Sequence, residues 1–216
     1  MATLEIFCRE VWCEVMIPVQ PQLEPSNFNI EVRTPGMQFL NRVRDPTNKQ
    51  WKNNNYWTRC SQNLYSAYEG ICAYTGIWVS KSSATVDHFI PKSNNPHLAY
   101  EWSNYRLSCD KANNNKSNEN ILDPFQIHYN WFLLDFPSLL VRPNQNILRS
   151  DHDNVERTID TLRLNSECFI EDRMHWLKEY IHNSDFDFLK RHAPFVAYEL
   201  QRQGLETQIV QMMPFT

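Results

Sequence analysis

The chain has 216 residues, of which 42% are hydrophobic and 13% aromatic, and this composition excludes a disordered or fibrous protein. Its 21 Lys and Arg residues are outnumbered by 25 Asp and Glu residues, so the formal net charge of −4 excludes a uniformly basic surface. Binding of a polyanion would therefore need a local positive patch or a partner protein. The length suits one domain with a good-sized core.

Neither the start of the chain nor its interior predicts export or membrane insertion. The first ten residues lack a basic leader followed by an apolar run, and a stretch of about 18 consecutive apolar residues occurs nowhere. The six cysteines are scattered without the pattern of a small secreted domain, which favours reduced thiols. We therefore expect a soluble, cytoplasmic protein with no membrane partner.

The N-terminal part is interrupted by prolines, and its β-rich stretch 11–17 predicts one or two short strands. Pro35 and Gly36 together are typical of a turn. The apolar spacing that follows predicts a short helix ending at Asp45, before a proline. A second helix is predicted over 51–69, where apolar residues recur at intervals of three to five.

The sequence pattern becomes extended after residue 72 and predicts a hairpin. Strands are expected at 84–89 and 105–109, joined by a long loop rich in Pro and Asn. Asp110 is a plausible N-cap for a polar helix that continues to Asn118. The expected local order is therefore strand, loop, strand, helix.

The C-terminal part is predicted to begin with a strand pair and to continue as helices. The strands are predicted at 131–136 and 138–142, on either side of a proline. Apolar spacing then predicts helices around 155–164, 168–181 and 186–200, the last interrupted by a proline.

The fold class expected from these elements is α+β. We predict a single domain over 1–216, composed of N-terminal strands and helices in 1–71, a strand-rich centre in 72–120 and a mainly helical part in 121–216. Neither internal repeats nor low-complexity linkers divide the chain.

The centre carries residues suited to phosphodiester hydrolysis, which needs a base for the attacking water and stabilisation of charge on the phosphate. His88 is the candidate base, and the neighbouring Asp87 is a hard oxygen ligand suited to Mg²⁺. Asn104, 16 residues after His88, is assigned to the catalytic set as the residue that fixes the hairpin loop. Asn113, nine residues further on, is the expected second metal ligand. These residues predict a metal-dependent nuclease.

Positive charge is concentrated around this centre. Within 81–116 the basic residues outnumber the acidic ones: Lys81, Lys92, Arg106, Lys111 and Lys116 against Asp87, Glu101 and Asp110. Lys116 lies one helical turn beyond Asn113 and is expected to hold a phosphate oxygen. Arg106 and Lys92 are further candidates for nucleic-acid binding.

The motifs of this region resemble those of HNH, or ββα-metal, endonucleases. Asp87 and His88 match the His block, Asn104 the middle Asn, Asn113 the final ligand and Lys116 the frequent Asn-x-x-Lys ending. The quoted stretches are Val86-Asp87-His88-Phe89-Ile90-Pro91-Lys92-Ser93, Leu98-Ala99-Tyr100-Glu101-Trp102-Ser103-Asn104-Tyr105-Arg106-Leu107 and Leu122-Asp123-Pro124-Phe125. These look like the small HNH effectors of bacterial anti-phage systems of the Septu and retron-associated type, and the resemblance covers roughly residues 35–185.

The resemblance implies a ββα-metal core embedded in mainly helical flanks. It also implies Mg²⁺-dependent cleavage of DNA, with Mn²⁺ able to substitute, that leaves 5′-phosphate and 3′-hydroxyl ends. A role in anti-phage defence alongside an ATPase partner follows from the same resemblance. Self-association is a further possibility, because one catalytic centre cuts two strands only as a dimer or in two successive nicks.

One feature of many such nucleases is incomplete in this sequence. Relatives brace the fold with zinc held by two Cys-x-x-Cys pairs, but here Cys72 is followed by Thr75 and Cys109 by Ala112 at the second positions. Two of the four thiolates are missing, and tetrahedral Zn²⁺ normally takes four Cys or His ligands. We therefore expect no structural zinc, with Cys72 and Cys109 packed near each other.

Each assignment has a plainer alternative. An Asp-His dipeptide is often a surface or core pair, an Asn run on a helix is often a solvated face, and Asn104 could be a turn residue. The residues 151–153 have the composition of a metal site, but Asp153 as a helix N-cap is the preferred interpretation. The aromatic residues over 51–74 could stack on bases, although their helical spacing favours a core.

Two other functions use the same residues. The fold could serve as a non-catalytic or conditionally silent subunit that binds DNA or a partner, which the negative net charge favours. An RNase would share the chemistry and differ only in accepting a 2′-hydroxyl.

Overall fold

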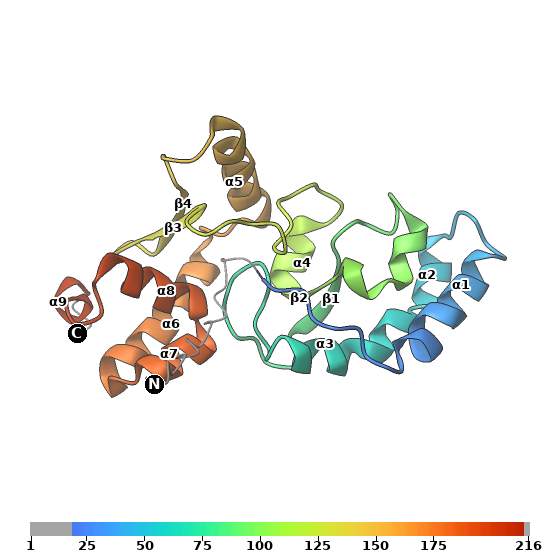
Figure 1. Ribbon diagram of the computed structural model, residues 1–216, viewed down its shortest axis with the longest axis horizontal. Coiled ribbons are helices and arrows are strands. Elements are labelled where there is room, and N and C mark those ends of the chain that lie inside the picture. The colour runs from blue at the N-terminus through green and yellow to red at the C-terminus, as the bar shows by residue number, and fades with distance from the viewer. Residues whose placement is uncertain (1–18, 214–216) are drawn as a thin grey trace, which may run out of the picture.

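The computed structural model describes residues 19–213, and the strands expected around residues 11–17 lie outside that range. Half of the chain is helical and a tenth is in strands, which confirms the α+β class. The elements follow one another along an elongated molecule (Figure 1). The N-terminal helices lie at one end, the central hairpin in the middle and the C-terminal helices at the other end. None of the helices in the described range is long and apolar enough to span a membrane.

The N-terminal part is a series of short helices. They are the π-helix Asn29–Arg33, α1 (Thr34–Leu40), α2 (Asn48–Asn53), the 3₁₀ helix Tyr56–Cys60 and α3 (Ser61–Ala67). The expected turn at Pro35 and Gly36 is wrong, because both residues lie inside α1. Proline is tolerated there because the first turn of a helix leaves its N–H groups without intrahelical partners.

The prediction of a single helix over 51–69 is also wrong, because helix α2 ends at Asn53 and two further helices follow it. Thr47 starts α2 with a capping box in which Gln50 returns the hydrogen bond. The helix ends after six residues, where Asn54 Nδ2 donates to the Gln50 carbonyl at 2.8 Å. Side chains of this kind compete with the backbone for its hydrogen bonds, and the three consecutive Asn residues explain the break.

The central hairpin and the helix after it confirm the predicted order. Strands β1 (Ala84–His88) and β2 (Tyr105–Cys109) pair antiparallel, with His88 opposite Tyr105. The connection contains two short 3₁₀ helices, Pro96–Tyr100 and Trp102–Asn104. Helix α4 (Asp110–Lys116) follows β2 directly.

The predicted N-cap of α4 was misplaced by one residue. Cys109 is the N-cap, and its Sγ accepts a hydrogen bond from the Ala112 backbone N–H at 3.4 Å. Asp110 is instead the first residue of the helix, where its negative charge favours the helix dipole.

The C-terminal part confirms the strand pair and the broken last helix. Its elements are β3 (Phe132–Asp135), β4 (Leu140–Pro143), α5 (Arg149–Leu162), α6 (Glu167–Asn183), α7 (Phe186–His192), α8 (Pro194–Gln203) and α9 (Ile209–Met212). Helix α5 begins four residues before Asp153, so the prediction that Asp153 is an N-cap is wrong.

Two hydrophobic clusters meet at the centre of the chain. The N-terminal helices pack with the hairpin through Tyr105 and Leu107, whereas the C-terminal helices pack with Cys72, Tyr74 and Ala112. The centre thus contributes apolar side chains to both clusters. This sharing supports the proposal of one domain over the whole chain.

Gly36 offers a test of this packing. A Cβ at this position would lie within 2.6 Å of three ring atoms of Tyr100. That ring cannot move aside easily, because it is wholly buried and its hydroxyl donates to the Asn54 carbonyl at 2.7 Å. We expect Gly36→Ala to lower the free energy of unfolding by about 1–3 kcal/mol, as overpacking does.

Urea unfolding of Gly36→Ala and Gly204→Ala would check this expectation. A Cβ on Gly204 meets no atom within 4 Å, and the variant bears only the strain of a positive φ, about 1 kcal/mol. Equal stability of Gly36→Ala and the unmodified chain would contradict the described contact.

Candidate active site

A cavity of about 140 Å³ lies where β1 ends beside α4. Its lining contains four of the residues singled out in the sequence: Asp87, His88, Lys92 and Asn113. The remaining lining residues are Trp57, Val86, Pro91, Ser117 and Asn118. Neighbouring residues of a strand point to opposite faces, so Asp87 and His88 can share the cavity only because the strand ends there.

His88 is held in one tautomer by the fold. Its Nε2 lies 3.0 Å from the Ala99 carbonyl oxygen. A carbonyl can only accept, so Nε2 carries the hydrogen and Nδ1 is the unprotonated nitrogen. Nδ1 has no hydrogen-bond partner among the described residues. The ring is held in place by edge-to-face contacts with Trp57 and Tyr105, at centroid distances of 4.8 and 5.3 Å.

The surroundings also keep the imidazole neutral. Burial, followed by the charge of Lys92, lowers the pKa of His88 to about 3, and the hydrogen bond to Ala99 opposes this shift only in part. A neutral ring can accept a proton, whereas a charged one cannot. His88 is therefore in the form required of a general base at neutral pH.

Asp87 is a buried carboxylate with two partners. The Tyr74 hydroxyl donates to Oδ2, and the Lys116 ammonium lies 3.2 Å from both carboxylate oxygens. Burial raises the pKa of Asp87, and the positive charge of Lys116 opposes that rise. The partners stabilise a charged group that would otherwise be costly inside the fold.

Asn113 has its side-chain orientation fixed by a neighbour on β1. Thr85 Oγ1 uses its own hydrogen to reach the Ser108 carbonyl at 3.2 Å, so it can only accept from the Asn113 side chain at 3.1 Å. The Asn113 amide nitrogen therefore faces Thr85, which leaves Oδ1 available to the cavity. An amide oxygen and a carboxylate are both hard ligands of the kind that Mg²⁺ prefers.

Asn104 lies beneath the hairpin loop. Its side chain accepts from the Ile90 N–H at 2.8 Å and donates to the carbonyls of Ile90 and Leu98 at 3.0 and 3.1 Å. These bonds join the two ends of the loop that follows His88. Asn104 does not line the cavity, so it acts on the site by holding the loop.

Two of the three basic candidates are placed differently from the expectation. Arg106 is buried and forms two hydrogen bonds with Asp123, at 2.9 and 2.7 Å, while its guanidinium lies 3.4 Å from the centroid of Phe125. Lys116 is wholly buried against Asp87. Neither presents its charge at the surface of the described structure, and phosphate binding by Arg106 or Lys116 stays a prediction.

Lys92 is the basic residue that reaches the cavity lining. It is half-buried, and its ammonium lies 5.4 Å from the ring centroid of Trp57. Burial lowers the pKa of Lys92, and the charge of Asp87 opposes this effect. Its position beside His88 suits a contact with a phosphate oxygen.

The prediction that Tyr74 and Trp57 pack in the core is confirmed, because both belong to or pack against the hydrophobic clusters. The sequence did not show that Tyr74 also contacts Asp87 and that Trp57 also contacts His88. The signal for Tyr74 is its place two residues after Cys72, which the sequence predicts to lie near Cys109. Nothing in the sequence around Trp57 indicates that it would lie over His88.

The two cysteines that match the zinc-braced relatives do lie together. The Cys109 N–H donates to Cys72 Sγ at 3.3 Å, which confirms their predicted proximity. Thr75 and Ala112, at the positions of the missing thiols, are buried. Hydrogen bonds and apolar contacts hold β2 and the start of α4 at this point.

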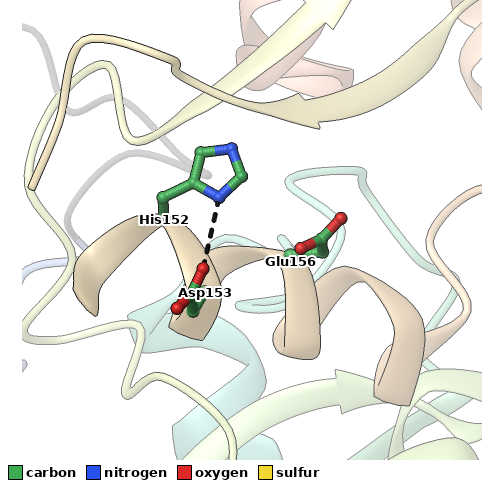
Figure 2. Close-up of side chains that lie close together, drawn as sticks. All are labelled: His152, Asp153 and Glu156. Carbon is green, nitrogen blue, oxygen red and sulfur yellow. Dashed lines mark ion pairs between the residues drawn. The ribbon is translucent and has the colours of Figure 1, made fainter. Parts of the chain in front are cut away.

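A separate group of possible metal ligands lies on α5. Ligand atoms of His152, Asp153 and Glu156 lie within 4.8 Å of one another, and His152 Nδ1 is 3.7 Å from Asp153 Oδ1. Figure 2 shows the three side chains on consecutive turns of one helix. Asp153 is 61% exposed, and His152 also contacts Gln145 through Nε2 at 3.1 Å. Exposed groups of this kind are common on helices without a bound ion.

Comparison with known families identifies the central segment. Residues 70–119 match the family model described as HNH endonuclease. The match contains β1, β2 and α4 and every cavity residue except Trp57. HNH endonucleases are metal-dependent enzymes that act on DNA. The similarity of this segment to them supports a nuclease, a hydrolase of phosphodiester bonds. A comparison with curated proteins gave no match.

The pKa of His88 predicts how stability depends on pH. The folded state resists protonation until about pH 3, whereas an unfolded histidine accepts a proton near pH 6.5. The contribution of the neutral His88 ring to the free energy of unfolding is fully present above pH 6.5, and it is lost as the pH falls from 6.5 towards 3. We expect a slope of up to about 1.4 kcal/mol per pH unit from this residue.

Urea unfolding at pH 7.5, 6.5, 5.5 and 4.5 would measure this slope. The unmodified chain should lose stability more steeply below pH 6.5 than His88→Gln, whose side chain does not titrate. Parallel curves for the two proteins would contradict the burial of a neutral His88.

Proposed function

We propose that this protein is a metal-dependent HNH endonuclease that hydrolyses DNA, with His88 as the general base. The observation that carries the proposal is that His88, whose Nε2 is held by the Ala99 carbonyl, lines one cavity together with the oxygen-bearing side chains of Asp87 and Asn113. A base and a cation site within one cavity are the two requirements of phosphodiester hydrolysis.

The residues present fit a single divalent ion. Asp87 and Asn113 would hold it through oxygen, and two protein ligands suit Mg²⁺, which usually keeps several water molecules. When bound, the ion would supply positive charge for the phosphate and the departing oxygen. The proposal of Mg²⁺ rests on the hard-oxygen character of both ligands.

The remaining residues would prepare the water and the phosphate. His88 Nδ1 would accept the proton of the attacking water, and the Ala99 carbonyl would stabilise the resulting imidazolium through Nε2. Burial is the main cause of the lowered pKa of His88, and the charge of Lys92 adds to it. A phosphate bound to Lys92 would offset that second effect and so raise the pKa of His88 in part.

The wider biological role is proposed from sequence resemblance. The motifs around Asp87 and Asn104 resemble the small HNH effectors of anti-phage systems, so we propose a defence nuclease that acts with an ATPase partner. The net charge of −4 supports a partner that contributes to DNA binding. The four cysteines in the described range, Cys60, Cys72, Cys109 and Cys168, are free, which supports a cytoplasmic protein.

A conditionally silent nuclease is the second candidate. The observation that favours it is the ion pair between Lys116 and Asp87, which occupies the carboxylate proposed as a metal ligand. Such a chain would bind DNA or a partner and cut only after that pair opens.

Plasmid nicking by His88→Ala tests the proposed base. Loss of a general base costs about 10²- to 10⁴-fold in rate, so nicking with Mg²⁺ should fall to that extent. His97→Ala is the matched control, because His97 is an exposed histidine of the same hairpin loop outside the cavity lining. EDTA should abolish cutting by both the unmodified chain and the control.

The result is read together with circular dichroism, which shows whether each variant is folded. A folded His88→Ala that nicks as fast as the unmodified chain would overturn the assignment of the base. If the unmodified chain binds metal but does not cut DNA in the absence of a partner, the result would favour the conditionally silent nuclease.

A further inference from the structure

Lys116 has an unusual position for a lysine. Its side chain has no exposed surface, and its ammonium donates to the His88 carbonyl at 2.9 Å as well as contacting Asp87. The ring of Phe89 lies on another side of the ammonium, at 5.9 Å. Lysine is rarely buried in this way unless it is paired, so the carboxylate explains why Lys116 can lie inside.

The ion pair with Lys116 compensates the buried negative charge of Asp87 in the metal-free fold. Asp87 is 3% exposed, and a carboxylate without water needs an opposite charge close by. Tyr74 supplies one hydrogen bond to it but no charge. Lys116 is therefore the main cation that stabilises a buried, ionised Asp87 when no metal is bound, and the charge of Arg106 makes a smaller contribution.

A metal ion would require the same carboxylate. Asp87 is the acidic member of the cavity lining, and Mg²⁺ binds such an oxygen at about 2.1 Å. The ammonium already contacts both oxygens at 3.2 Å, so a bound ion and Lys116 would be two positive charges within a few ångströms.

We propose that Lys116 is an internal counter-ion that competes with the divalent metal for Asp87, so that metal binding displaces its ammonium from the carboxylate. This inference rests on the metal site of the proposed function. Lys116 is a positioning residue in this account, because it acts through Asp87. Competition makes the metal-free protein stable and its metal affinity low, and it sets a threshold of metal concentration for activity.

Variants that remove or keep the charge separate competition from simple packing. Lys116→Gln keeps a donor for Asp87 and the His88 carbonyl but has no charge, whereas Lys116→Arg keeps the charge. Lys92→Gln removes one positive charge from the same cavity that acts on Asp87 only at longer range, without a hydrogen bond or ion pair, and is the matched control. Asp87→Asn shows whether the measured ion binds at this site.

The measurement is Mn²⁺ binding at pH 8, followed by the electron paramagnetic resonance of free Mn²⁺, with the thermal midpoint of each metal-free protein. Lys116→Gln should bind Mn²⁺ at least about tenfold more tightly than the unmodified chain, because one close positive charge is gone. Its metal-free midpoint should fall, because Asp87 loses its counter-ion. Lys116→Arg and Lys92→Gln should change the affinity much less.

A second measurement is made on the unmodified protein and uses a variant only to assign one signal. The ¹⁵N resonance of the Lys116 ammonium, assigned by its absence in Lys116→Arg, should move or broaden when Mg²⁺ is added to the unmodified protein. Equal Mn²⁺ affinity of the unmodified chain and Lys116→Gln, or an ammonium signal unchanged at saturating Mg²⁺, would overturn the competition and leave the nuclease proposal intact. Absence of Mn²⁺ binding in every variant, or equal binding by Asp87→Asn, would overturn the metal site and the competition with it.

Discussion

The buried carboxylate of Asp87 is the constraint on which the rest of the site depends. It lies at the end of β1 and connects two other segments, because Tyr74 donates a hydrogen bond to it and Lys116, at the end of α4, forms an ion pair with it. A charge in this position is stable only while a cation lies close to it. The fold therefore keeps a cation site at the hairpin, which Lys116 fills in the described structure and which a metal ion would use in the proposed reaction.

Rigid placement of His88 depends on the loop between the two hairpin strands. The Ala99 carbonyl in that loop fixes the tautomer, and Asn104 closes the loop through three hydrogen bonds. At the opposite end of the hairpin, contacts between Cys72 and Cys109 hold the start of α4. The proposed base and the proposed ligand Asn113 are thus held from both ends of one hairpin.

The sequence was most informative where structure is local. The order of hairpin and helix could be predicted, because alternation, turn residues and motif spacing all lie within 84–116. The sequence also indicated that Asp87, His88 and Asn113 would meet. The burial of Lys116 and Arg106 was not predictable, since it depends on Asp87 across the hairpin and on Asp123 beyond it. Local hydrogen bonds of Asn side chains likewise outweighed the apolar spacing that predicted one helix over 51–69.

The location of a bound Mn²⁺ tests the central claim most directly, because anomalous diffraction identifies the ion without any assumption about activity. Crystals of the unmodified chain soaked with Mn²⁺ should show a peak between the Asp87 carboxylate and Asn113 Oδ1, with the Lys116 ammonium moved away from Asp87. An Asp87 still paired with Lys116 beside a bound Mn²⁺ would contradict only the competition between the two cations. A peak confined to the group of His152, Asp153 and Glu156 on α5 would contradict the proposed single-metal site.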